Sequence, residues 1–308
     1  MEKLSVEDLK RKKIIDDYIE DRTSDENIKN SKKELREVST IIKQLNDFID
    51  GSLELNAIGI EIRIKRLISH FTINLIYELD SNIAFRRARK FEEKTSKVDY
   101  FFDEVQDMSY IPDDKKSRNR LGRFNQKAES IYYASIHYED DELKHFSTAL
   151  SEINTNKLDY INVLDSVPKK RLNVVYLGVF DYFIRNKETP KWIDSTYRTV
   201  FEAFKSKCIE IDSLDIFEQY ILSNAFLADI TQREGSDRLY EVTSTLSSCL
   251  LKPNEVEAIV YESVKVRNEP NIAIKPIIVD KYIVHRDAYS FKINEDLGYG
   301  MYDTDLIN

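Results

Sequence analysis

Arginine and asparagine side chains occur at two places where the chain could present them to an anionic ligand. Residues 85–89 read Phe-Arg-Arg-Ala-Arg, an apolar strand that runs into arginine, and Arg87 and Arg89 are its candidate binding residues. Arg123 follows a glycine and precedes Asn125 by two residues, where a turn can present both side chains to one cleft. Guanidinium groups bind phosphate oxygens in bidentate fashion, so these arginines predict a phosphate site; a solvated basic run is the alternative for 85–89.

Glu152 is the carboxylate with the most informative surroundings. It lies after a predicted strand, at the expected start of a helix-like segment with an apolar flank. A carboxylate beside a sugar can stabilise oxocarbenium charge or bind a ribose hydroxyl. A metal site between His137 and His145 is disfavoured because the acids and histidines there have no known ligand spacing, and a solvated acidic loop is the better interpretation.

Ser263 lies at the end of a predicted strand, where a hydroxyl can donate a hydrogen bond to a ligand. The chain has four scattered histidines and no Gly-x-Ser-x-Gly elbow, so a hydrolase triad is not expected. The seven glycines form neither Gly-x-Gly-x-x-Gly nor a Walker loop, which excludes a Rossmann or P-loop nucleotide site. If the chain binds a dinucleotide, side chains must hold it.

Several of these fragments, in their order and spacing, resemble the RES domain family. The family signature is an early Arg, a Gly-Arg-Trp-Asn turn, a Tyr-Ala-Ser strand, a Glu and a late Ser. The matching segments are Arg87, Leu121-Gly122-Arg123-Phe124-Asn125, Ile131-Tyr132-Tyr133-Ala134-Ser135, Glu152, and Ile259-Val260-Tyr261-Glu262-Ser263 with Asn271. The resemblance covers roughly residues 81–285. Two positions depart from the pattern: Phe124 replaces Trp, and Ala128 replaces a Gly whose turn geometry alanine tolerates poorly.

The resemblance implies an NAD-consuming enzyme with an ADP-ribosyltransferase-like fold. RES toxins commonly cleave NAD by phosphorolysis, so the expected substrates are NAD and inorganic phosphate, with no metal, and the expected partner is an antitoxin. The implied roles are phosphate binding by Arg87, Arg89 and Arg123, stacking or ribose orientation by Tyr133, and stabilisation of transition-state charge by Glu152. The residues expected to position the substrate are Asn125, Tyr261, Ser263 and Asn271. The catalytic set is therefore predicted as Glu152, Arg123 and Tyr133.

Two other functions compete with phosphorolysis. A protein ADP-ribosyltransferase would use the same NAD groove but deliver the sugar to a side chain. A non-catalytic interaction protein is favoured by the departure at Ala128, by the long insertions and by the helical N-terminus.

The composition of the 308-residue chain limits its possible partners. The formal charge of −9 argues against a general nucleic-acid binder, because such binding requires a basic surface. Cys208 and Cys249 have no zinc-ligand or Cys-x-x-Cys spacing, which indicates reduced thiols in the cytoplasm. The sequence shows neither an export signal nor an apolar run of membrane-spanning length, so no membrane association is expected.

The expected fold is α+β: a mixed central β-sheet with helical insertions, preceded by a helical region. The predicted division is residues 1–80 for the helices and 81–308 for the NAD-binding domain. A capping box at 31–34 precedes an apolar stripe formed by Leu35, Val38, Ile42, Leu45 and Ile49. Packing of this stripe inside the chain is preferred to a dimer seam.

The remaining elements follow from hydrophobic periodicity. We expect a helix over 56–79, a surface excursion over 91–119, a strand over 130–136 and helices over 155–250. Strands are predicted at 258–261, 272–275 and 277–284, and the C-terminal tail is expected to cover the surface.

Overall fold

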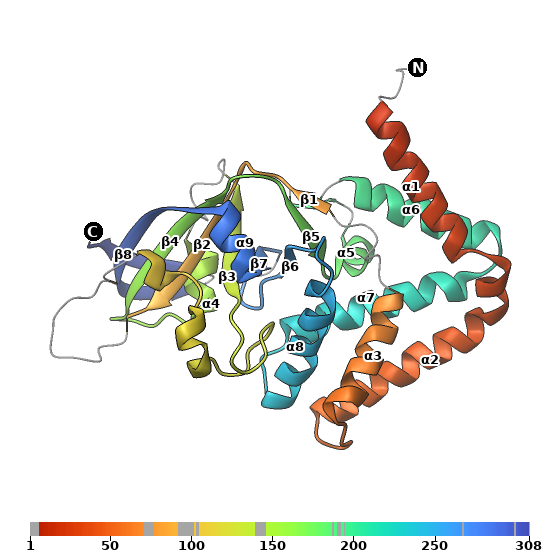
Figure 1. Cartoon of the computed structure of the whole chain (residues 1–308), viewed down its shortest axis with the longest axis horizontal. Helices are drawn as coiled ribbons and strands as arrows, with labels where there is room; N and C mark the ends of the chain where they lie inside the picture. The colour runs from red at the N-terminus through yellow and green to blue at the C-terminus, as the bar shows by residue number, and fades with distance from the viewer. Residues whose placement is uncertain are drawn as a thin grey trace.

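A mixed nine-stranded sheet organises the chain, and helices pack on both of its faces (Figure 1). The computed structural model describes residues 6–70, 77–91, 102, 105–138, 146–186, 188–189, 192–193, 195–266, 268–298 and 300–307, and side chains from residue 13 onward. Within these residues only β5 and β6 pair in parallel; the other neighbouring strands pair antiparallel. The predicted α+β class is confirmed.

The sheet brings together segments that are far apart in the sequence. Its strands are β1 (Tyr77–Leu79), β2 (Ile83–Lys90), β3 (Tyr132–Tyr138), β4 (Tyr160–Pro168), β5 (Leu172–Tyr176), β6 (Ala258–Glu262), β7 (Pro270–Ile274), β8 (Ile283–Gly298) and β9 (Met301–Leu306). Their spatial order is β1-β5-β6-β7-β3-β2-β4-β8-β9. At the centre of the sheet, β3 from the middle of the chain therefore lies between β2 from the first third and β7 from the last third.

The helices gather mainly at one end of the molecule, on the right in Figure 1. They are α1 (Val6–Arg22), α2 (Asp25–Ile49), α3 (Ala57–Ser69), α4 (Ser147–Glu152), α5 (Val179–Arg185), α6 (Ser195–Glu210), α7 (Leu214–Gln232), α8 (Asp237–Leu251) and α9 (Pro276–Tyr282). Two 3₁₀ turns, η1 (Val105–Met108) and η2 (Asp113–Arg118), lie between β2 and β3.

Two apolar cores cover opposite faces of the sheet. One core joins β-strand residues such as Phe85 and Tyr132 to α1, α5, α6 and α9. The other joins Ile259 and Ala273 to α2, α3, α7 and α8. Because side chains alternate along a strand, Tyr261 belongs to the second face and its neighbour Val260 to the first.

The N-terminal helices share cores with later parts of the chain. Val38 and Leu45 of the predicted stripe are fully buried beside α3, α7 and α8, so the stripe packs inside the chain as expected. Ile15 and Tyr18 of α1 belong to the core that contains α6. The boundary between residues 1–80 and 81–308 stays a prediction.

The N-terminal sequence signals were read incorrectly at two points. Helix α2 begins at Asp25 after Ser24, so Ser31 lies inside the helix, where it is buried, and 31–34 is not a capping box. The predicted helix over 56–79 ends at Ser69, and 77–79 pairs with β5 as strand β1; residues 71–76 lie outside the described part. Ile60 and Ile64 of α3 are buried while Ile58 and Ile62 are exposed, so the alternating isoleucines occupy opposite faces of a helix.

Later elements also differ from the prediction. Within 155–250, β4 and β5 are strands: both are buried, which removes the polar alternation that marks a half-exposed strand. The strands at 258–261 and 272–275 are confirmed as β6 and β7, but 276–282 is helix α9, with Pro276 at its first turn, a position that proline favours. The C-terminal tail is not a loose cover, because β8 and β9 complete one edge of the sheet.

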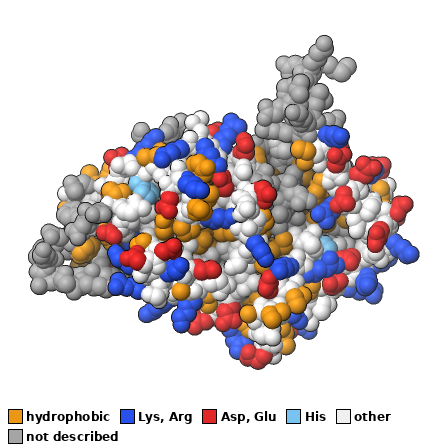
Figure 2. Space-filling view, in the orientation of Figure 1, with side chains coloured by type: hydrophobic (Ala, Val, Ile, Leu, Met, Phe, Trp, Pro, Cys, Tyr) orange, Lys and Arg blue, Asp and Glu red, His pale blue; other side chains and the backbone are white. Residues whose placement is uncertain are grey.

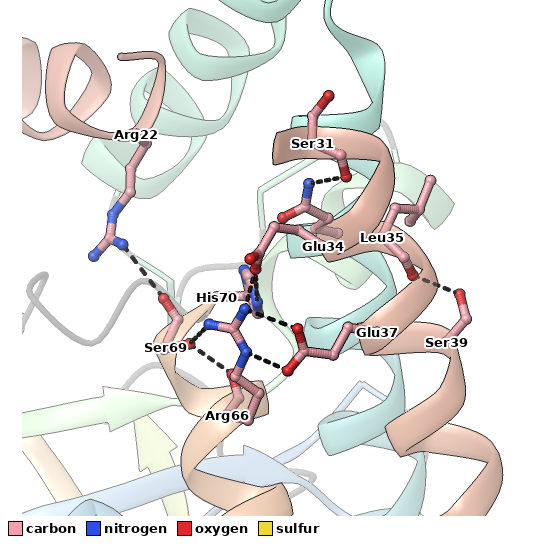
Figure 3. Close-up of polar contacts among 10 residues, drawn as sticks. Arg22, Ser31, Glu34, Leu35, Glu37, Ser39, Arg66, Ser69 and His70 are labelled. Carbon is pink, nitrogen blue, oxygen red and sulfur yellow. Dashed lines mark hydrogen bonds and ion pairs between the residues drawn. The ribbon is translucent and has the colours of Figure 1, made fainter. Parts of the chain in front are cut away.

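An ion cluster ties α3 to α2 in the helical region (Figure 3). Arg66 donates to Glu37 over 3.0 Å and also pairs with Glu34. His70 lies beside this cluster, and its Nε2 is 3.6 Å from Glu34 while its ring meets Tyr220 edge-on. Since Arg66 already engages both carboxylates, burial and the positive charges of Arg66 and Arg22 lower the pKa of His70 to about 4.

The low pKa of His70 predicts that acid destabilises the fold. Between about pH 6.5 and pH 4 the unfolded chain binds a proton at His70 that the folded chain does not, so stability falls as the pH is lowered through this window. His70→Phe keeps a ring against Tyr220 but cannot bind the proton. When the pH is lowered from 7 to 4.5, we expect the free energy of unfolding to fall by about 2 kcal/mol less in this variant than in wild type. Urea unfolding at both pH values measures this difference, and equal losses in the two proteins would contradict the prediction.

Candidate active site

A cavity of about 270 Å³ opens on the sheet face that carries α4 and α8. Its lining residues come from β2, β3 and β7, from the end of β6, from the 119–130 turn, from α4 with the residue that follows it, and from α8. They are Arg86, Arg87, Ala88, Arg123, Tyr133, Ala134, Ser135, Ala149, Glu152, Ile153, Tyr240, Tyr261 and Asn271. Six predicted site residues, Arg87, Arg123, Tyr133, Glu152, Tyr261 and Asn271, thus line one cavity. Sequence reasoning placed these residues in a common site without knowing the strand order.

The carboxylate of Glu152 is held in place by two predicted site residues. Asn271 donates from Nδ2 to Glu152 Oε1 over 2.7 Å, and the hydroxyl of Ser263 donates to the same oxygen. The Ser263 oxygen in turn accepts the backbone N–H groups of Lys265 and Val266 at 3.1 and 3.0 Å. The contacts of Ser263 are therefore with Glu152 and its own turn, which makes it a support for the carboxylate.

Each of these residues is placed by a different element. Glu152 is the last residue of α4, so it lies at the end of a helix and not at the start of one as expected. Asn271 lies in the centre of the sheet on β7, opposite Ser135 on one side and Tyr261 on the other. It is only 2% exposed, and its Oδ1 has no hydrogen-bond partner among the described residues. This acceptor is available to a ligand or an ordered water.

Arg87 fills a gap between two strands. The β2–β3 pairing ends at Arg86 and Ser135, whereas β2 continues to pair with β4 as far as Lys90. Where the pairing stops, Arg87 donates from Nη1 to the carbonyl of Tyr133 over 2.9 Å and from Nε to that of Met108 over 3.0 Å. Burial lowers its pKa to about 10, so Arg87 remains charged at neutral pH. No ion pair to Arg87 is found among the described residues.

The 119–130 turn is built around the hydroxyl of Tyr133. This hydroxyl accepts the N–H of Phe124 over 2.8 Å and donates to Asn125 Oδ1 over 3.0 Å. A Cβ on Gly122 would lie 2.4 Å from Asn125 Oδ1, so the turn requires glycine there. Asn125 is a buried support for the turn and does not line the cavity.

Ala128 adopts a backbone conformation that favours glycine. Its φ is +62°, in the left-handed region, and its N–H donates to the carbonyl of Asn119 over 3.1 Å. This conformation costs an alanine about 1–2 kcal/mol of backbone strain.

Arg123 joins the turn to the end of α7. Its Nη1 donates to the carbonyl of Thr231 and its Nη2 to that of Arg233 over 3.0 Å. These carbonyls lie at the C-terminal end of the helix, where positive charge is stabilising. The Cζ atom of Arg123 also lies 5.9 Å from the ring centroid of Tyr240 on α8. Arg123 thus brings a positive charge to the cavity, while these two hydrogen bonds go to backbone carbonyls.

Arg89 does not line the cavity. Its guanidinium donates to the carbonyl of Asp107 and lies over the ring of Phe102 at 4.9 Å. Arg87 and Arg86 both line the cavity, whereas Arg89, two residues beyond Arg87 along β2, lies beside η1.

Sequence reasoning did not select Arg86, Ser135 or Tyr240, which all line the cavity. Arg86 donates from Nε to Asp165 Oδ1 over 3.1 Å and lies 4.5 Å above the ring of Phe146, while its buried Nη1 has no partner among the described residues. The signal that could have found Arg86 and Ser135 is strand alternation. Ser135 shares a face with Tyr133, and the antiparallel register places Arg86 beside Ser135.

The cavity tyrosines are neutral hydrogen-bonding groups. Burial raises the pKa of Tyr261, and the nearby negative charge of Glu152 raises it further. Burial also raises the pKa of Tyr133 well above its usual range. Neither hydroxyl can act as a base at neutral pH, so Glu152 is the only negatively charged side chain among the residues that line the described cavity.

Comparisons with protein-family models, with curated proteins and with solved structures found no match to this chain. The RES resemblance therefore depends on the residues named above and stays a prediction.

Other surface properties bear on partners. None of the helices in the described residues has an apolar stretch long enough to cross a lipid bilayer. On the face shown in Figure 2, Lys and Arg side chains are interspersed with Asp and Glu. The described residues include no group of three or more His, Cys, Asp or Glu side chains placed to hold a metal ion. Residues 139–145, which form most of the segment between His137 and His145 discussed above as a metal site, lie outside the described residues.

The hydroxyl of Tyr133 should control the stability of the 119–130 turn. Tyr133→Phe removes the acceptor for Phe124 N–H and the donor to Asn125 Oδ1, so we expect a loss of about 1–3 kcal/mol in the free energy of unfolding. The amide of Phe124 should also exchange faster with solvent. Urea unfolding and amide hydrogen exchange test this prediction, and wild-type protection of that amide in the variant would show that the hydroxyl is dispensable.

Proposed function

We propose that this protein cleaves the nicotinamide–ribose bond of NAD, with inorganic phosphate as the preferred acceptor. The observation that carries the proposal is the carboxylate of Glu152, fixed by Ser263 and Asn271 at the edge of a cavity that also contains the partly buried Arg87. The identity of the substrate comes from the RES resemblance, and the geometry supports it because six residues of the resemblance line one cavity. An ADP-ribosyltransferase-like relationship of the fold is part of the same proposal.

The reaction needs little more than one carboxylate. The nicotinamide nitrogen of NAD carries a positive charge, and when the glycosidic C–N bond breaks, its electron pair returns to that nitrogen and gives neutral nicotinamide. No acid has to protonate the leaving group. Positive charge develops instead on the ribose, where a fixed carboxylate stabilises it. This fits a cavity lined by one carboxylate and, among the described residues, no histidine.

Phosphate then completes the reaction without a separate catalytic base. An oxygen of the phosphate dianion forms a bond to the ribose carbon that nicotinamide leaves, and the products are nicotinamide and ADP-ribose phosphate. With water as acceptor a proton must leave the attacking oxygen; Tyr133 and Tyr261 are unable to take it at neutral pH, which leaves that task to Glu152. The phosphate dianion needs no such base, and the RES resemblance implies phosphate as the acceptor.

Uncompensated positive charge supports an anionic substrate. Arg87 and Arg123 donate to backbone carbonyls, which leaves their charges without a carboxylate partner among the described residues. A buried cation attracts anions strongly because the surroundings screen its charge poorly. Arg86 adds an unused donor, Nη1, although Asp165 balances its charge. The pyrophosphate of NAD fits this environment.

A protein that consumes NAD must be restrained in the cell that makes it. We therefore propose that it acts in the cytoplasm as a toxin with a cognate antitoxin, which the RES resemblance implies.

Glu152→Gln should lower kcat for NAD cleavage by about 100- to 1000-fold while the protein stays folded, because the amide keeps the shape but loses the charge. The matched control is Glu210→Gln, which changes an exposed glutamate of α6 and should leave the rate unchanged. Purified proteins are incubated with NAD, with and without inorganic phosphate, and the products are identified by NMR and mass spectrometry. Nicotinamide release that depends on phosphate and on Glu152 is the expected result.

Other outcomes would identify a different function. Release of ADP-ribose without phosphate would indicate hydrolysis, and labelled ADP-ribose bound to protein would indicate an ADP-ribosyltransferase. NAD that stays intact in every sample would refute the enzymatic proposal in favour of a non-catalytic interaction protein.

A further inference from the structure

We propose that the C-terminal hairpin of β8 and β9 is a clamp that holds α4 so that Glu152 faces the cavity. In this proposal, which rests on the proposed function, Gly300 and Tyr302 are positioning residues of the site. The hairpin lies at the sheet edge and is the last element of the chain, far in sequence from every predicted catalytic residue.

The first observation is a direct polar contact to α4. The hydroxyl of Tyr302 on β9 lies 3.2 Å from the hydroxyl of Ser151, the residue that precedes Glu152. Ser151 is buried, and Tyr302 also packs against the apolar cluster under α4. A change at Tyr302 therefore acts one residue away from the carboxylate.

The second observation is the close approach of Gly300. A Cβ at this position would lie 3.4 Å from Ser151 Oγ and 3.8 Å from both Ser147 Cβ and Val266 Cγ2. Ser147 begins α4, and Val266 belongs to the turn whose amides hold Ser263. A side chain at position 300 would thus meet both supports of Glu152, the helix that carries it and the turn that binds its Oε1.

The third observation is the dependence of α4 on its surroundings. A helix of six residues is too short to be stable by itself, so packing must hold it. Ala149 and Leu150 pack on Ala88 and Val163 of the sheet and on Ile293 of β8. The hairpin therefore supplies part of the platform beneath α4 as well as the contacts beside it.

Glu152 is consequently held between two sets of contacts. Ser263 and Asn271 bind its carboxylate from the side of β6 and β7, while the hairpin fixes its backbone through Ser151. Small displacements of a catalytic group reduce the rate strongly even when the substrate still binds. Loosening the hairpin should thus affect turnover more than affinity.

The chain offers a matched pair of glycines to test this clamp. Gly298 and Gly300 have φ of +79° and +74°, in the same hairpin, but a Cβ on Gly298 would meet nothing within 4 Å. Asparagine tolerates this backbone conformation, so Gly298→Asn and Gly300→Asn carry similar strain, and only the second places a side chain against α4, where its atoms beyond Cβ need further room. Tyr302→Phe removes the Ser151 contact without adding bulk.

We expect Gly300→Asn and Tyr302→Phe to lower kcat for NAD roughly tenfold with KM unchanged, whereas Gly298→Asn behaves as wild type. Amide hydrogen exchange is measured on the same full-length proteins. Exchange at residues 150–152 should accelerate in Gly300→Asn and Tyr302→Phe, while β6 and β7 keep their protection. An increase in KM alone, or equal effects of the two glycine substitutions, would overturn the proposal.

The exchange measurement separates this inference from the proposed function. If wild type does not cleave NAD, the function fails, but faster exchange of α4 in Gly300→Asn relative to Gly298→Asn would still establish the clamp. If wild type cleaves NAD and both glycine variants match it in rate and in α4 exchange, the clamp fails and the function stands.

Discussion

The hydrogen bonds to Glu152 Oε1 are the interaction on which the site depends. They join residues 152, 263 and 271, and each comes from an element that needs the rest of the sheet: α4 needs the platform of β2, β4 and β8, Ser263 needs the end of β6, and Asn271 needs its place between β3 and β6. Without these partners a carboxylate at the end of α4 would have no fixed direction. The site therefore depends on the strand order, which places the β6–β7 pair directly beside the β3–β2 pair.

The three cavity arginines show how the fold divides its positive charge. Arg87 bridges the gap where β2 and β3 separate, and Arg123 binds the final carbonyls of α7, so both hold the walls of the cavity together. Each of these two guanidinium groups donates to two backbone carbonyls, which supply hydrogen bonds without negative charge, so neither charge has a carboxylate partner among the described residues. Arg86 differs: Asp165 balances its charge, and its Nη1 has no partner in the described residues. The unbalanced charges and the unpartnered Nη1 thus belong to different side chains.

The residues that the RES resemblance selected at Glu152, Tyr133 and Asn271 lie on one cavity, although whether they form a functional site stays a prediction. Arg89, which the sequence grouped with Arg87, does not line that cavity, because a run of arginines does not indicate where along β2 the cavity ends. Strands β4 and β5 were read as helix because buried strands lack polar alternation, and α9 was read as strand because its β-branched residues follow Pro276. The contacts of the C-terminal hairpin with α4 join positions about 150 residues apart, which no local pattern encodes.

The N-terminal helices are connected to the cavity through a short chain of contacts. Asn46 of α2 accepts a hydrogen bond from Arg233 over 2.9 Å, and the carbonyl of Arg233 accepts one from Arg123. Arg123 belongs to the turn that Tyr133 organises at the cavity wall. Helix α2 also packs on α7 in a shared core, so it contacts the helix whose final carbonyls hold Arg123. The helical region is thus connected, through Arg233 and Arg123, to the turn at the cavity wall.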